Sequence, residues 1–168
     1  MCVEAVKILC KKSGISPLEI ELLICATVTP DMVFPATSNI ICAKAGATNA
    51  WGFDVQAACS SFLSALNIAS KFIESGTHKK ILVIGSDKMS SIIDYTCRKT
   101  SILFGDGAGA VLLEPCTDGT GIIDTRMYAD GSGKKHLFQA AGGSLIPASI
   151  ESVTNKQHFM TMEGQPVF

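Results

Sequence analysis

Apolar runs of strand length recur along this chain, and segments with helical spacing separate them. Three of the runs are continuous: "LLICAT" at 22–27, "KILVIGSD" at 80–87 and "GAVLLE" at 109–114. A fourth run has Trp51, Phe53 and Val55 at every second position, which is the period of a half-buried strand. Continuous apolar strands separated by helices are typical of a mostly parallel sheet that is covered on both faces. We therefore expect an α/β fold in which one layer holds the strands near 22–27, 52–58, 80–86 and 108–114.

Further elements are expected from capping and turn signals. Thr37 or Ser38 is predicted to cap a short helix that runs through Ala45. The segment 121–128 has the composition of another strand, and 162–168 has the pattern of a helix that is just starting.

Composition excludes several classes of protein. With 168 residues, of which 47% are hydrophobic, and a mean hydropathy of +0.33, the chain can bury one sizeable core. A net charge of −1 does not indicate binding to nucleic acid or to an anionic membrane. No apolar run approaches the ~18 residues that a membrane helix needs. The seven cysteines include no C-x-x-C pair. We therefore expect neither a disulfide framework nor a metal site, and a protein of the reducing cytoplasm.

The junction at Cys59 is the strongest candidate for chemistry. The strand pattern ends on this cysteine, and apolar residues from 62 to 73 then recur at helical steps up to a stop at Gly76. Ser60 and Ser61 are suitable N-caps for that helix. The N–H groups of a first helical turn favour a thiolate, and the residue's own N–H can help to hold an oxyanion. The alternative is that Cys59 is a small buried hydrophobe, as most free cysteines are.

The glycines in "FGDGAGAVL" do not indicate a nucleotide site. A dinucleotide fingerprint needs a strand before it and a helix after it, whereas Gly105, Gly107 and Gly109 lead into an apolar strand. We expect these glycines to let the backbone pass close beneath the cysteine loop.

Four motifs in the right order closely resemble the β-ketoacyl-acyl carrier protein synthase III family: "FPATSN", "GFDVQAACSSF", "SDKMSSIIDYTCRKTSILFGDGAGAVLLEP" and "MEGQPVF". The resemblance implies a thiolase-like fold of two similar halves in a five-layered αβαβα arrangement, assembled as a homodimer. Residues 1–128 resemble the first half without its opening strand and helix. Residues 129–168 resemble the insertion loop that follows and the start of the next helix. The second half is absent, so we expect this chain to be a piece of a longer protein.

The same resemblance implies an acyltransferase of type II fatty acid synthesis. In that family a thiolate, here Cys59, takes an acyl group from acyl-coenzyme A, and malonyl-acyl carrier protein then decarboxylates and attacks the acyl-enzyme. The family's histidine and asparagine, which steady the enolate, belong to the absent half. His78, His136 and His158 are interpreted as ordinary surface histidines, so we expect this chain alone to be inactive. The expected partners are acyl carrier protein and acyl-coenzyme A, with the thioester as substrate and no cofactor.

Five further site residues follow from the resemblance alone. Phe34 matches the aromatic residue that crosses the dimer interface to the partner's acyl pocket, and Arg98 matches an arginine near the adenine and phosphates of coenzyme A. The acyl-pocket positions are Met89, Phe104 and Met162. Core packing and a solvated surface cation are the alternatives for these residues. Ser61 departs from the glycine that is usual two places after the nucleophile.

Two rival functions stay open at this stage. One is a sister thiolase-fold synthase, of the hydroxymethylglutaryl type or a polyketide ketosynthase. The other is a non-catalytic fragment that dimerises or binds acyl carrier protein. Retention of Cys59 argues against the second, because such a subunit has no need of a thiol there.

Overall fold

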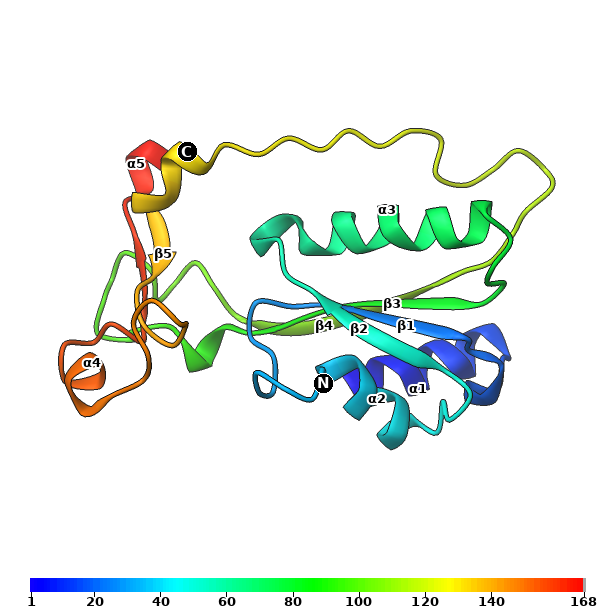
Figure 1. Ribbon diagram of the computed structural model, residues 1–168, viewed down its shortest axis with the longest axis horizontal. Coiled ribbons are helices and arrows are strands. Elements are labelled where there is room, and N and C mark those ends of the chain that lie inside the picture. The colour runs from blue at the N-terminus through cyan, green and yellow to red at the C-terminus, as the bar shows by residue number, and fades with distance from the viewer. Residues whose placement is uncertain (168) are drawn as a thin grey trace. The chain divides into compact units, whose positions relative to one another are not determined.

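A four-stranded sheet forms the centre of the fold in the computed structural model, which describes residues 1–167. Its strands are β1 (Leu22–Ala26), β2 (Trp51–Val55), β3 (Ile81–Lys88) and β4 (Asp106–Leu113), in the order β2-β1-β3-β4 (Figure 1). Strand β1 runs parallel to both of its neighbours, with Leu22 opposite Trp51 on one side and Ile81 on the other. The predicted α/β class and the four strands of one layer are confirmed.

Helices cover both faces of this sheet. α1 (Cys2–Ser13) and α2 (Thr37–Ala45) lie against one face, and α3 (Ser61–Glu74) lies against the other (Figure 1). No helix within residues 1–167 has the length and apolar character that crossing a membrane requires. The shorter elements are 3-10 turns, short helices and two short strands: η1 (Pro17–Glu19), η2 (Ala58–Ser60), η3 (Met89–Ser91), η4 (Gly131–Lys135), β5 (Leu137–Gln139), α4 (Ile150–Thr154), β6 (Met160–Met162) and α5 (Gly164–Val167).

The burial of β1 explains why its sequence is apolar without alternation. All five of its residues are buried. Leu23 and Cys25 pack in the core cluster beneath α1 and α2, whereas Leu22 and Ile24 pack in the cluster beneath α3. Each fully buried Leu or Ile side chain contributes about 1.5–3 kcal/mol relative to an exposed one. A central strand under helices on both faces therefore stabilises the whole layered arrangement.

Close backbone approach occurs at two glycines other than those predicted. A Cβ atom at Gly52 would lie 2.6 Å from the backbone oxygen of Leu23, and one at Gly85 would lie 2.9 Å from the ring of Phe62. A Cβ atom at Gly105, Gly107 or Gly109 would meet nothing within 4 Å. The expected close passage of these three glycines beneath the cysteine loop is therefore wrong.

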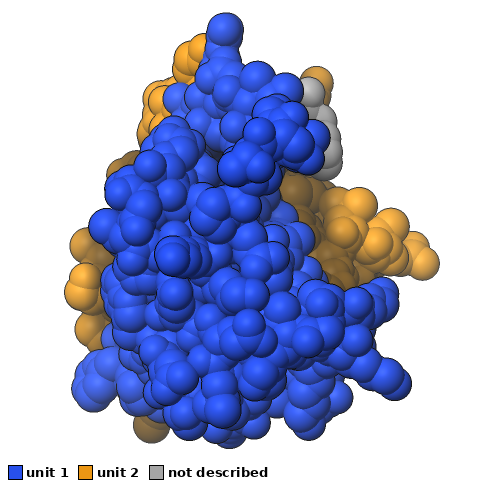
Figure 2. Space-filling model, turned by 90° about the vertical axis from the view of Figure 1, so that its right-hand side faces the viewer, with its two compact units in different colours: residues 1–87, 107–127 blue, residues 88–106, 128–168 orange. Residues whose placement is uncertain are grey.

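The chain forms two compact units (Figure 2). The first comprises residues 1–87 and 107–127, and the second comprises 88–106 and 128–168. Within the second unit, β5 and β6 pair antiparallel, with Leu137 opposite Met162. The predicted division at residue 128 concerns the two-half architecture of the family and stays a prediction.

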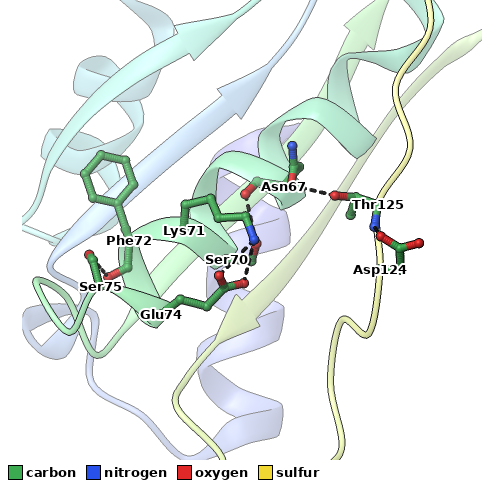
Figure 3. A network of polar contacts seen from close by, with 8 residues as sticks. All are labelled: Asn67, Ser70, Lys71, Phe72, Glu74, Ser75, Asp124 and Thr125. Atoms are coloured by element: carbon green, nitrogen blue, oxygen red, sulfur yellow. Dashed lines mark hydrogen bonds and ion pairs between the residues drawn. The ribbon is translucent and has the colours of Figure 1, made fainter.

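The segment 121–128 does not form the expected strand. Its residues are exposed and have no strand assignment. Thr125 lies beside α3, and its hydroxyl donates to Oδ1 of Asn67 at 2.8 Å (Figure 3). A strand needs a neighbour that pairs with its backbone, and this segment contacts a helix instead. The helix expected over 162–168 is present as α5, and Phe168 lies outside the described residues.

The outer surface of α3 is partly apolar, as its sequence indicates. Leu63 is 60% exposed, whereas Ile68 packs against the core cluster. Lys71 and Glu74 form an exposed ion pair at 2.8 Å on the same helix (Figure 3). Such a surface pair contributes little to stability, so α3 is held in place by the apolar side chains beneath it.

A candidate nucleophile elbow

Cys59 lies in a tight turn between a strand and a helix. β2 ends at Val55, the 3-10 turn η2 follows, and α3 begins at Ser61. The thiol of Cys59 is exposed, whereas three other cysteines are buried: Cys10, Cys25 and Cys42. The predicted junction is therefore present, and the alternative of a buried hydrophobic cysteine is wrong.

The backbone of this turn adopts an unusual conformation just before the cysteine. Ala58 has a φ of 48°, in the left-handed region that residues with a Cβ atom rarely occupy. The Ser60 N–H donates to the Ala57 carbonyl at 3.1 Å and closes the turn. Left-handed conformations at residues other than glycine cost about 1–3 kcal/mol and are concentrated at functional sites. A sharp strand-to-helix turn of this kind exposes a nucleophile above the sheet.

Two serine side chains hold the turn instead of capping α3. The Ser60 hydroxyl donates to the Ala57 carbonyl at 2.8 Å. The Ser61 hydroxyl accepts from the Ala57 N–H at 2.7 Å and donates to the Ala58 carbonyl at 2.6 Å. Ser60 occupies the N-cap position but makes no side-chain capping bond, so the predicted capping role of both residues is wrong. Both hydroxyl groups donate backwards along the chain, to the carbonyl groups of Ala57 and Ala58.

Asp54, on the strand that leads to the elbow, caps a different helix. Its carboxylate accepts from the N–H groups of Thr37 and Ser38 at 2.7 and 2.8 Å, at the start of α2. The expectation that Thr37 or Ser38 caps α2 is therefore wrong, because these residues are already in its first turn. The loop that carries Phe34 ends where α2 begins, so Asp54 joins this loop to the strand before Cys59.

The other end of the same loop is held by Asp87. Its carboxylate accepts from the Val28 N–H at 2.8 Å and from the Thr27 hydroxyl at 3.2 Å. Sequence reasoning missed both Asp54 and Asp87. The available signal was an acidic residue near the carboxyl end of an apolar strand, where parallel strands bring loops together.

Phe34 is at the exposed surface of this loop. Its side chain is 82% exposed, and that of Val33 is 89% exposed. The alternative that Phe34 packs in the core of this chain is wrong. Val33 and Phe34 therefore place two neighbouring apolar side chains at the surface of this loop.

Four of the predicted site residues belong to the second unit, whereas Cys59 and Phe34 belong to the first. Met162 is buried at the end of β6. The other three are the half-buried Met89 and Phe104 and the exposed Arg98.

Arg98 directly follows a turn that the partly buried carboxylate of Asp94 stabilises. Asp94 accepts from the Thr96 N–H at 2.9 Å, from the Thr96 hydroxyl at 2.6 Å and from the Lys156 ammonium at 2.9 Å. These bonds, with those from Thr96 the larger cause, lower the pKa of Asp94 to about 2. Within residues 1–167 the Arg98 guanidinium has no ion-pair partner. An unpaired arginine on a fixed turn can bind an anion such as a phosphate.

The turn that carries Met89 is anchored in the same way. Both the N–H and the hydroxyl group of Ser90 donate to the Asp106 carboxylate at 2.7 Å. These hydrogen bonds lower the pKa of Asp106 below its ordinary value. The turns that carry Met89 and precede Arg98 are therefore each fixed by an aspartate, which the sequence alone did not indicate.

The three histidines differ in their hydrogen-bond partners. His78 accepts from the Trp51 indole N–H at 3.1 Å, and His136 shares a 2.7 Å hydrogen bond with Glu163. His158 has a buried Nδ1 atom without a hydrogen-bond partner among the described residues. All three side chains are partly buried, and their interpretation as ordinary surface histidines stays a prediction. No group of three or more potential metal ligands occurs between residues 1 and 167.

Comparison with known proteins gives a consistent result. The model of the family described as 3-Oxoacyl-[acyl-carrier-protein (ACP)] synthase III matches residues 53–131. The chain is 57% identical to the β-ketoacyl-[acyl-carrier-protein] synthase III of Chlorobium phaeobacteroides over 170 residues, which cover all of this chain and 52% of the relative. It is 51% identical to the protein of the same name from Koribacter versatilis, with 51% of that relative covered.

Solved structures agree with these relatives. The 3-oxoacyl-[acyl-carrier-protein] synthase III of Aquifex aeolicus is similar with a TM-score of 0.85 and 38% identity, over 99% of this chain and 49% of the other. The priming β-ketosynthase of the R1128 polyketide pathway is similar with a TM-score of 0.87 and 34% identity, over 99% and 49%. This likeness confirms the predicted thiolase-like fold class. The chain spans about half the length of the curated relatives that it matches.

Proposed function

We propose, because this chain belongs to the 3-oxoacyl-[acyl-carrier-protein] synthase III family, that it supplies the nucleophile of a condensing enzyme of fatty acid synthesis. The reaction joins an acyl group from acyl-coenzyme A to malonyl-acyl carrier protein and yields β-ketoacyl-acyl carrier protein. One observation carries this proposal: an exposed Cys59 in a strained turn at the start of a 14-residue helix.

In the first step, the Cys59 thiolate attacks the carbonyl carbon of the acyl-coenzyme A thioester. The carbonyl oxygen becomes an oxyanion, and the Cys59 N–H at the start of α3 is the proposed donor to it. The bond to the coenzyme A sulfur then breaks, and coenzyme A leaves as a thiolate that takes up a proton. The acyl group stays on Cys59 as a new thioester.

In the second step, malonyl-acyl carrier protein loses carbon dioxide, and the resulting carbanion attacks the acyl carbon on Cys59. The carbon–sulfur bond breaks, the Cys59 thiolate is regenerated and the β-ketoacyl product leaves on the carrier protein. This step needs a group that stabilises the enolate. His78 and His136 are engaged with Trp51 and Glu163, and the Nδ1 atom of His158 is buried. We therefore propose that the enolate-stabilising histidine and asparagine come from a further part of the protein.

Substrate recognition is proposed from the exposed groups. Arg98 binds a phosphate of coenzyme A, because its guanidinium is exposed and has no partner within residues 1–167. Met89, Phe104 and Met162 are proposed to line the acyl pocket. Phe34 crosses a homodimer interface to the partner's pocket, which its 82% exposure supports. The reaction requires no cofactor beyond the thioester substrate, and the seven free thiols agree with a cytoplasmic location.

Acylation mapping tests the proposal. The chain is incubated with acetyl-coenzyme A, and each cysteine-containing peptide is weighed by mass spectrometry. We expect the acetyl group on Cys59 and none on Cys116, which is also exposed and is the internal control. Acylation of Cys116 but not Cys59, or of neither, would overturn the proposal and would favour a non-catalytic binding fragment.

A second experiment tests whether this chain carries out the condensation step on its own. With malonyl-acyl carrier protein added, this chain alone should form no β-ketoacyl product, because the histidine and asparagine that stabilise the enolate are proposed to come from a further part of the protein. Turnover by the chain alone would show that its own residues complete the active site. A sister polyketide ketosynthase, favoured by the likeness to the R1128 enzyme, would share the acylation and differ in the carrier protein that it accepts.

A further inference from the structure

We propose that Ser61 is a positioning residue that orients the Cys59 N–H toward the developing oxyanion. The proposal rests on the proposed function, because it concerns the oxyanion donor of that mechanism. Ser61 is 4% exposed and contributes no group to the surface near the thiol. Its effect on the reaction is therefore exerted through the backbone that it holds.

The hydroxyl group of Ser61 both donates and accepts a hydrogen bond in this turn. It accepts from the Ala57 N–H at 2.7 Å and donates its one hydrogen to the Ala58 carbonyl at 2.6 Å. The Ser61 N–H also donates to the Ala58 carbonyl. Two donors from the same residue therefore converge on one carbonyl oxygen.

That carbonyl belongs to the peptide unit between Ala58 and Cys59. A trans peptide is planar, and its C=O and N–H groups point in opposite directions. Two donors that fix the Ala58 C=O therefore also fix the direction of the Cys59 N–H, which points away from them. An oxyanion donor is effective only when it is already aimed at the place where the charge develops.

The strained conformation of Ala58 explains why the turn needs the hydrogen bonds of the Ser61 hydroxyl. A residue with a Cβ atom at a φ of 48° tends to relax to a negative φ, and such a change would rotate the Ala58–Cys59 peptide. The Ser61 hydroxyl opposes that rotation from both sides of Ala58, since it binds the Ala57 N–H and the Ala58 carbonyl. A glycine at this position, which the resemblance to the family implies as usual, has no hydroxyl and could bind neither group.

The test compares two reactions of the same thiol. Attack on p-nitrophenyl acetate builds an oxyanion, whereas alkylation by iodoacetamide displaces iodide without one. We expect Ser61→Ala to lower the rate of acetylation at Cys59 about tenfold, below the 10²–10³-fold loss for removal of a whole oxyanion donor. The alkylation rate at Cys59 should stay within about twofold. Both rates are measured on this chain by peptide mass spectrometry, so their ratio does not depend on recognition of coenzyme A.

Matched variants separate positioning from folding. Ser61→Thr keeps the hydroxyl and should restore the ratio, while Ser61→Gly removes it and should lower the ratio as Ser61→Ala does. Ser70→Ala removes another buried hydroxyl of α3, which donates to the Asn67 carbonyl at 2.9 Å, and should leave the ratio unchanged. An unchanged ratio in Ser61→Ala and Ser61→Gly, or an equal fall in Ser70→Ala, would overturn the proposal. If wild-type chain is acetylated by p-nitrophenyl acetate but not by acetyl-coenzyme A, the proposed function fails while the ratio still decides the role of Ser61.

Discussion

Removal of the Asp54 carboxylate should destabilise the first unit through a helix that is distant in sequence. Asp54 accepts two short hydrogen bonds, at 2.7 and 2.8 Å, from the first N–H groups of α2. The Ala36 N-cap provides no side-chain bond of its own. In Asp54→Ala, the N–H groups of Thr37 and Ser38 lose their acceptor in a partly buried position.

The magnitude follows from three ranges, of which the first two overlap at about 1.5–2 kcal/mol and the third is added to them. Loss of an N-cap side chain costs about 0.5–2 kcal/mol, and a hydrogen bond to a charged group contributes about 1.5–3 kcal/mol. The charge at the helix N-terminus adds about 0.3–1 kcal/mol. We expect Asp54→Ala to lower the free energy of unfolding by about 2–3 kcal/mol. Asp54→Asn keeps one acceptor oxygen but loses the charge, and should cost about half as much.

Urea unfolding followed by circular dichroism measures the effect. With a slope of about 1–3 kcal/mol per molar urea, a loss of about 2–3 kcal/mol lowers the midpoint by about 0.7–3 M in Asp54→Ala, with no change in the slope. Asp31→Asn is the matched control, because it removes a charge on the loop before α2 from a side chain without a hydrogen bond among the described residues. A change below about 0.5 kcal/mol in Asp54→Ala, or an equal change in Asp31→Asn, would refute the capping argument.

Three other perturbations have expected outcomes. Gly52→Ala places a Cβ atom 2.6 Å from a backbone oxygen and should cost about 1–3 kcal/mol in urea unfolding, whereas Gly109→Ala, with nothing within 4 Å, should cost less than about 0.5. Arg98→Ala should weaken coenzyme A binding about tenfold in calorimetry, and an equal loss in Lys44→Ala would count against a specific phosphate contact. The pKa of Asp94 is lowered to about 2 from 3.8, so its stabilisation is present above pH 3.8 and is lost as the pH falls through about 2. The Tm difference between wild type and Asp94→Asn should therefore disappear near pH 2, and a difference that persists there would contradict this assignment.

Local sequence patterns were sufficient to predict the sheet and the elbow. β1 reads as an uninterrupted apolar run because helices cover both of its faces, and that burial leaves no position for a polar residue. The change from alternating to helical spacing around Cys59 located the turn to within a few residues. In both cases the signal lies within one segment, so it can be read without knowledge of the neighbours.

The missed features all depend on contacts between distant segments. Asp54 caps a helix whose first N–H group belongs to a residue 17 positions away in the chain. The close approach at Gly52 depends on the pairing of β1 with β2, which places Leu23 opposite it. Likewise, 121–128 has the composition of a strand, but a strand forms only where a partner edge is available. Composition alone gives neither the partner nor the register.

The N-termini of α2 and α3, near the carboxyl end of β2, differ in whether a carboxylate already binds them. The N-terminus of α2 is occupied by the Asp54 carboxylate. The N-terminus of α3 has no acidic residue in its first turn and no side-chain capping bond. Each helix end favours one nearby negative charge, and a fixed carboxylate satisfies that preference permanently. The end of α3 therefore keeps its preference for the charge that forms at Cys59 during the proposed acyl transfer. Its serine hydroxyl groups bond backwards to the turn, so they hold the nucleophile in place without competing for that position.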